Sequence, residues 1–174
     1  IFLLLIISII SIIKIKTKSK TTLAEKYDNI IDLESSLYQW KYDNEMTLSE
    51  IEKNKGKKER IPNDEFPKNY INAILEAREK YDIVLTSMHW NLLEYFNKNK
   101  IDFYLAYPKL DSGDILKQRC IERGNTESWA QSIKEKVELW YPKIKEYNIK
   151  NVIFIDKEEC LEDVLIKMDL LNGE

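Results

Sequence analysis

Short apolar segments alternate along this chain with amphipathic segments of helical period. Mostly apolar segments of strand length fall at residues 29–33, 82–87, 102–107 and 151–156, and a longer apolar run fills residues 1–13. Helices are predicted between and after them, at residues 20–26, 69–80, 90–97, 112–123, 126–147 and 158–171. Strands that alternate with helices are typical of βαβ units around a parallel sheet. The pattern therefore predicts an α/β fold, a three-layer αβα domain with a roughly five-stranded parallel sheet.

The predicted helix 126–147 has the clearest periodicity. Its large apolar residues recur every three or four positions, which predicts that they share one face against the core. They are Trp129, Ile133, Val137, Trp140 and Ile144. The preceding Gly124-Asn125 is a helix C-cap signal that separates this helix from the one before it.

The apolar run 1–13 has more than one explanation. It is shorter than the ~20 residues that span a bilayer, and it lacks the charged start and small-residue cleavage site of a signal peptide. A buried parallel strand is favoured, because such strands are apolar on both faces. A truncated membrane or signal segment and an unnatural start of the chain stay open as alternatives.

Composition narrows the classes of function. The 174 residues suit one domain, and the net charge of −3 gives no reason to expect a nucleic-acid partner. Cys120 and Cys160 lack the spacing of a zinc site or a disulfide framework, which favours a reducing, cytoplasmic location. Glycine stands only at positions 56, 113, 124 and 173, so residues 1–55 hold no glycine-rich phosphate loop of standard sequence.

Ligands of open parallel sheets bind beyond the carboxyl ends of the strands. In the predicted order, those ends are residues 16–22, 32–36, 86–89, 107–109 and 156–157. The first of these segments joins a predicted strand to a helix that begins with lysine and threonine. We therefore expect the chemistry of the protein at this edge.

The segment KIKTKSKTTLAEKYDNIIDLESS resembles the region of a P-loop kinase in which a lysine and a hydroxyl residue open the first helix. The later segments KNYINAI, YDIVLTSMH, DFYLAYP and QRCIERGN resemble small nucleotide-kinase-like P-loop proteins of phages and low-GC bacteria. The resemblance covers residues 14–170. It departs from the family where the loop has Lys14 and Ser19 in place of glycines, because glycines let the backbone wrap closely around phosphate.

The resemblance implies a phosphotransferase that uses ATP and Mg²⁺ to phosphorylate a nucleotide or nucleoside. Ser19, Lys20, Thr21 and Thr22 would then bind the cofactor. Lys20 would neutralise the β- and γ-phosphates, Thr21 would ligate Mg²⁺, and Thr22 would contact the α-phosphate. If the gene is phage-encoded, the location is the host cytoplasm.

The resemblance also implies catalytic roles outside this helix. Asp32 would orient the acceptor or a metal-bound water. A turn with a helix cap explains Asp32, Glu34 and Ser35 equally well. Arg119 and Arg123 would act from a lid-like region, residues 109–131, on the transferring phosphoryl group. Surface ion pairs are the alternative for these arginines.

Residues 37–66 are expected to form an insertion on the acceptor side. Its basic stretch, residues 53–60, would hold an acceptor phosphate or form a solvated loop. The alternating Tyr38, Trp40 and Tyr42 would stack on a base or cover the sheet edge, and His89 would line the cleft or be an ordinary loop histidine.

Three functions stay open. The first is the phosphotransferase. The second is a catalytically impaired binding protein of the same fold, favoured by the missing glycines. The third is a small membrane-anchored protein, favoured by the apolar run 1–13. The acceptor and the oligomeric state, monomer or dimer, are left undetermined by the sequence.

Overall fold

The computed structural model describes residues 8–12, 19–42, 50, 60–122 and 124–171. Its main sheet has five strands in the order β2-β5-β1-β6-β7, and every neighbouring pair is parallel. The strands are β1 (Ser8–Ile12), β2 (Ile30–Leu33), β5 (Ile83–Ser87), β6 (Phe103–Pro108) and β7 (Val152–Ile155). The mixed α/β class predicted from the sequence is confirmed.

The larger helices follow the predicted spans to within a few residues. They are α1 (Ser19–Lys26), α4 (Lys68–Arg78), α5 (Trp90–Lys98), α6 (Gly113–Glu122), α7 (Glu127–Glu146) and α8 (Leu161–Lys167). The last helix is shorter than predicted. It begins at Leu161 because Cys160 occupies the N-cap, where its backbone N–H donates to the Asp163 carboxylate at 2.8 Å.

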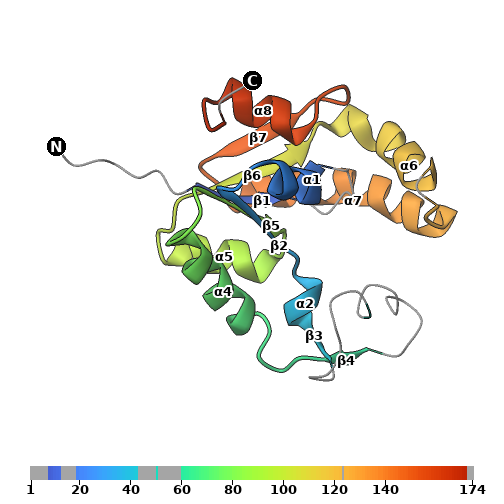
Figure 1. Cartoon of the computed structure of the whole chain (residues 1–174). Helices are drawn as coiled ribbons and strands as arrows, with labels where there is room; N and C mark the ends of the chain where they lie inside the picture. The colour runs from blue at the N-terminus through green and yellow to red at the C-terminus, as the bar shows by residue number, and fades with distance from the viewer. Residues whose placement is uncertain (1–7, 13–18, 43–49, 51–59, 123, 172–174) are drawn as a thin grey trace.

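The strand order explains which helices cover which face. From β1 the chain moves to the edge strand β2, and every later connection moves back across the sheet in the opposite direction. Right-handed crossovers then place α1 on one face and α4, α5 and α7 on the other. The two buried clusters agree with this, and α8 packs on the α1 face. In Figure 1, α8 and the pair α4 and α5 lie on opposite sides of the sheet.

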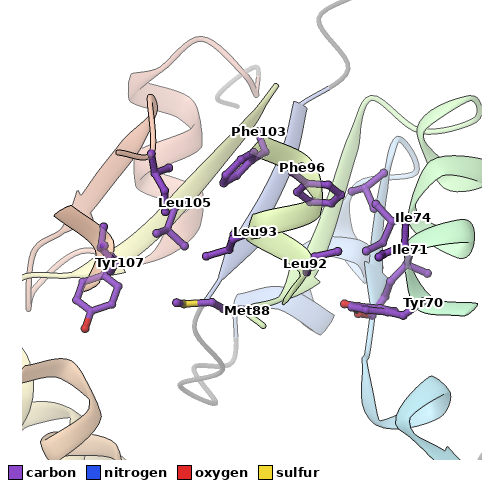
Figure 2. Packing of buried hydrophobic residues seen from close by; sticks show 14 of the residues in the cluster. Tyr70, Ile71, Ile74, Met88, Leu92, Leu93, Phe96, Phe103, Leu105 and Tyr107 are labelled. Carbon is purple, nitrogen blue, oxygen red and sulfur yellow. The ribbon is translucent and has the colours of Figure 1, made fainter. Parts of the chain in front are cut away.

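The larger core lies between the sheet and α4, α5, α6 and α7. Figure 2 shows the α5 side chains Leu92, Leu93 and Phe96 between those of β6 and those of α4. All three are fully buried. Along β6 the side chains alternate, so that Leu105 faces this core and Ala106 faces the smaller one.

The smaller core lies between the sheet and the helices α1 and α8. Leu23 of α1 and Leu165 of α8 are buried in it against Leu85 of β5. At its border, the Tyr27 hydroxyl donates to Glu162 of α8 at 2.8 Å, which fastens the first helix to the last.

A small projection follows β2, mostly within the residues 37–66 that were expected to form an insertion, but its helix and strands were not predicted. It consists of α2 (Ser36–Gln39) and the antiparallel pair β3 (Trp40–Lys41) and β4 (Ile61–Pro62), and it extends away from the sheet in Figure 1. A 3₁₀ turn, η1 (Leu110–Ser112), links β6 to α6. Within the described parts of the chain, no helix has the length and apolarity needed to cross a membrane.

Candidate functional site

The carboxyl edge of the sheet contains the point at which the chain changes direction. The central strand β1 ends at Ile12 between β5 and β6, and α1 begins at Ser19. The connection after β1 runs toward the β2 edge of the sheet, whereas the connections after β5 and β6 run toward the β7 edge. Such a switch point is where open α/β sheets bind ligands.

The residues expected to bind phosphate stand at this point. Lys20 and Thr21 lie in the first turn of α1, and Thr22 follows them with an exposed side chain. Backbone N–H groups of a first helical turn and the helix dipole favour an anion. The side chains of Ser19, Lys20 and Thr21, and the whole of residues 13–18 with Lys14, lie outside the described residues.

A cavity of about 710 Å³ opens beside this point, at the carboxyl ends of β2 and β5. Ser35 and Ser36 follow β2, and Ser87 and His89 come from the end of β5 and the residues after it. These are the segments in which the sequence predicted chemistry. A volume of this size is in the usual range of ~300–1,000 Å³ for small-molecule sites.

The opposite wall of the cavity comes from α6 and α7. Cys120 of α6 and Asn125 of the α6–α7 connection lie on it, followed by Trp129, Ile133 and Lys136 of α7. Thr126 caps α7 by accepting a hydrogen bond from the Trp129 amide at 3.3 Å, which fixes the first turn of that wall. This wall includes residues of the predicted lid-like region, 109–131.

A cationic side chain lies over each of two aromatic rings in the lining. The Arg60 guanidinium lies 5.5 Å from the ring centroid of Trp40, in the projection that follows β2. On α7, the Lys136 ammonium lies 5.2 Å from the ring centroid of Trp129. Among the described residues that line the cavity there is no aspartate or glutamate. The lining is therefore cationic and aromatic.

The Tyr70 hydroxyl joins the two strand ends that carry the serines. It donates to the Leu33 carbonyl of β2 at 2.8 Å and accepts from the Ser87 amide of β5 at 2.8 Å. Burial raises the pKa of this hydroxyl, so it stays protonated and keeps both bonds. Its ring packs against Tyr38, with centroids 5.2 Å apart. The geometry of the cavity floor thus depends on one buried tyrosine.

Ser87 and His89 differ in their surroundings. The Ser87 side chain is 3% exposed, and its hydroxyl has no hydrogen-bond partner among the residues that the structure describes. The half-buried His89 ring packs edge-on against Phe66, with centroids 5.2 Å apart. His89 therefore lines the cavity, one of the two positions expected for it, and Ser87 holds a hydroxyl that a ligand could satisfy.

Asp32 and Arg119, two further predicted catalytic residues, are not among the lining residues. Asp32 pairs in register with Leu85 and shares with it the sheet face that α1 covers. Arg119 donates to the Lys157 carbonyl, beyond the end of β7, at 2.7 Å. Arg123 lies outside the described residues. Ser35 stands at the N-cap of α2, but its side chain makes no capping hydrogen bond.

Sequence reasoning misplaced one lining residue, missed a second, and named a third only as part of a longer stretch. Trp129 was expected in the core, but it is 47% exposed because it lies in the first turn of α7, before the helix meets the sheet. Lys136 gave no signal in the sequence. Arg60 belongs to the basic stretch 53–60, whose other members lie outside the described residues. The rest of the predicted stripe on α7 is buried or half-buried.

Residues able to bind a metal ion are sparse in the described regions. They hold no group of three or more histidine, cysteine, aspartate or glutamate side chains that could bind an ion. Comparison of the sequence with protein-family models and with curated proteins finds no match.

Proposed function

We propose that this protein is a phosphotransferase of the P-loop type that uses ATP and Mg²⁺ to phosphorylate a nucleotide or nucleoside. One juxtaposition carries the proposal. The helix that opens with Lys20, Thr21 and Thr22 begins at the switch point of the sheet, beside a cavity of about 710 Å³ that would hold the acceptor. Donor and acceptor sites that share one sheet edge are what a direct transfer requires.

The residues of α1 would hold the donor. Lys20 would neutralise the β- and γ-phosphates, Thr21 would ligate Mg²⁺, and Ser19 and Thr22 would contact phosphate oxygens beside the helix N-terminus. When bound, ATP supplies the phosphoryl group and Mg²⁺ neutralises its charge. We assign to Asp32 the role of orienting metal-bound water, from the sheet face that α1 covers. Arg119 and Arg123 would grip phosphate oxygens from the α6 side.

Binding of ATP tests this proposal. At 100 times its dissociation constant, a ligand stabilises the folded state by about 2.7 kcal/mol, which raises the melting temperature of a chain this size by roughly 5–10 °C. We expect this shift with ATP and Mg²⁺, and its loss in Lys20→Ala. Lys98→Ala, an exposed lysine at the end of α5, is the matched control and should keep the shift. The absence of any shift at millimolar ATP would contradict the proposal.

A catalytically impaired binding protein is the second candidate, because residues 1–55 contain no glycine. Without glycine, a loop that wraps phosphate must place side chains in strained backbone conformations, at a cost of ~1–3 kcal/mol each. ATP binding that depends on Lys20 but gives no ADP, with every common nucleoside and nucleoside monophosphate tried as acceptor, would select this candidate. ADP formation that Lys20→Ala abolishes would exclude it.

A further inference from the structure

We infer that the cavity takes a nucleoside monophosphate, that is, an acceptor with a phosphate group, and not a free nucleoside. The inference rests on the proposed function and deepens it by naming the class of acceptor. It is carried by the charges of the lining, by the chemistry that a hydroxyl acceptor needs, and by the aromatic rings and the buried Ser87 hydroxyl.

The charges favour an anionic ligand. Arg60 and Lys136 reach the lining from separate elements, the projection after β2 and the helix α7. No carboxylate of the described lining residues neutralises them. A phosphate group would be held by these two cations, and the planar arginine can grip two of its oxygens at once. An uncharged nucleoside has no negative charge to pair with either cation.

A hydroxyl acceptor would need a base that this lining does not suit. The hydroxyl of a nucleoside must lose its proton as it attacks a phosphoryl group, and a positioned base must take that proton. An ionised phosphate oxygen attacks without losing one. His89 is the lining residue able to act as a base, and its ring is packed edge-on against Phe66 and Tyr70, as a wall residue would be.

The remaining lining suits the nucleoside part of such a ligand. Trp40 and Trp129 also line the cavity, and a base could stack on the ring face that Arg60 or Lys136 does not cover, a contact worth ~1–3 kcal/mol per base in nucleic-acid binding. Ser87 adds a hydroxyl near that of Tyr70 that makes no hydrogen bond of standard geometry in the described chain. Because this oxygen is buried from solvent, a ligand would reach it by rotation of the side chain, and a hydrogen bond formed there removes the cost of leaving it unsatisfied. The described lining thus combines two cations, two indole rings and several hydrogen-bonding side chains, Ser87 among them.

The test is calorimetric binding to the full chain in the absence of ATP, so that it does not depend on phosphoryl transfer. The probes are AMP, GMP, CMP, UMP and dTMP, each beside its own nucleoside, and inorganic phosphate. We expect at least one monophosphate to bind at least about tenfold more tightly than its nucleoside and than inorganic phosphate. Arg60→Gln and Lys136→Gln should each weaken that binding by about tenfold or more.

Lys143→Gln is the matched control for Lys136→Gln. Lys143 stands on the same helix with its ammonium 5.8 Å from the ring centroid of Trp90, and it does not line the cavity. It should leave binding unchanged. Circular dichroism and urea unfolding of each variant show that it is folded before its affinity is compared.

Three results would overturn the inference: no monophosphate binds, a nucleoside binds as tightly as its monophosphate, or both charge variants bind like the control. These results are separate from those that test the proposed function. Monophosphate binding without binding of ATP would support the inference and contradict the phosphotransferase. Binding of ATP that depends on Lys20, together with equal affinity for nucleosides, would do the reverse.

Discussion

Among single residues, Ser87 is one whose replacement should have different effects on the stability of the fold and on ligand binding. Its buried hydroxyl has no partner in the described residues, so replacing it should not lower stability. For Ser87→Ala we expect an unchanged free energy of unfolding, or a gain of up to about 1 kcal/mol, together with weaker binding of a monophosphate. Urea unfolding and calorimetry measure the two effects.

Ser112→Ala separates these effects. Ser112 is also buried with a hydroxyl that lacks a partner in the described structure, but it stands in η1 and does not line the cavity. It should show the same small change in stability and no change in binding. A loss of stability above about 1 kcal/mol in Ser87→Ala would show that the hydroxyl is satisfied in the folded protein.

Tyr70 is expected to behave in the opposite way. Tyr70→Phe keeps the ring but removes the hydroxyl that joins Leu33 to Ser87, which leaves a buried carbonyl and a buried amide unpaired. We expect a loss of about 1–3 kcal/mol in the free energy of unfolding. Urea unfolding monitored by circular dichroism measures it.

Tyr81→Phe is the control for Tyr70→Phe. Tyr81 packs half-buried against the same core cluster. Its hydroxyl has no hydrogen bond to the other described residues, so this change should cost little. Equal losses in the two variants would show that the hydrogen bonds of Tyr70 contribute nothing specific.

Among the secondary-structure elements, the connection between α6 and α7 determines where one wall of the cavity lies. Gly124 ends α6 with a φ of +78°, and its amide donates to the Ile121 carbonyl at 2.8 Å. No atom lies within 4 Å of a Cβ placed there, so Gly124→Ala tests backbone strain alone. We expect a loss of about 1–2 kcal/mol, measured by urea unfolding.

Gly124→Asn is the informative companion, because asparagine tolerates positive φ better than alanine does. It should recover part of the loss. If alanine and asparagine are tolerated equally and without cost, the connection does not hold this conformation in solution.

The elements also show how far the sequence could predict the structure. Residues 90–97 and 126–147 carry periodic apolar residues, and α5 and α7 match them to within one residue at each end. The strands β3 and β4 have two residues each and show no period, so the sequence predicted an insertion after β2 but not the strands within it. Gly124 was recognised because its backbone conformation depends on its own residue type and little on distant contacts.

The candidate site was predictable where its residues directly follow a predicted strand or open a predicted helix. Lys20, Thr21 and Thr22 are consecutive, and their place at the start of α1 follows from the order of apolar and polar segments. The cavity instead combines Arg60 with Lys136, which are far apart in the sequence and meet only when the chain folds. Periodicity assigned Trp129 to the core because it gives the face of a helix, and it cannot tell where along the helix the core ends.

At the scale of the whole molecule, one sheet lies between the two cores and contributes side chains to both. Ile83 and Leu85 of β5 face the helices α1 and α8, whereas Val84 between them faces the larger core. Because a single strand contributes to both cores, loss of either exposes the other side of the same sheet. This arrangement favours unfolding of the two layers as one unit.

Acid should weaken the contact between the end of α1 and α8. Hydrogen bonds from Lys26 and Tyr27 hold the pKa of Glu162 below its usual value of 4.5. Because the folded-state pKa lies below the unfolded-state value, the contribution of Glu162 to stability is complete above about pH 4.5 and is lost as the pH falls through the folded-state pKa. The same direction holds for Asp156, whose pKa Lys109 lowers.

We therefore expect the free energy of unfolding to fall on acidification from about pH 5 to pH 3. The variant Glu162→Gln should be less stable than the natural chain at neutral pH, and its free energy of unfolding should fall less on acidification. Urea unfolding at a series of pH values measures both slopes. Glu25→Gln, an exposed carboxylate of α1 without an ion pair to the other described residues, should keep the natural slope. Identical slopes for all three proteins would show that the bond between α1 and α8 does not stabilise the smaller core.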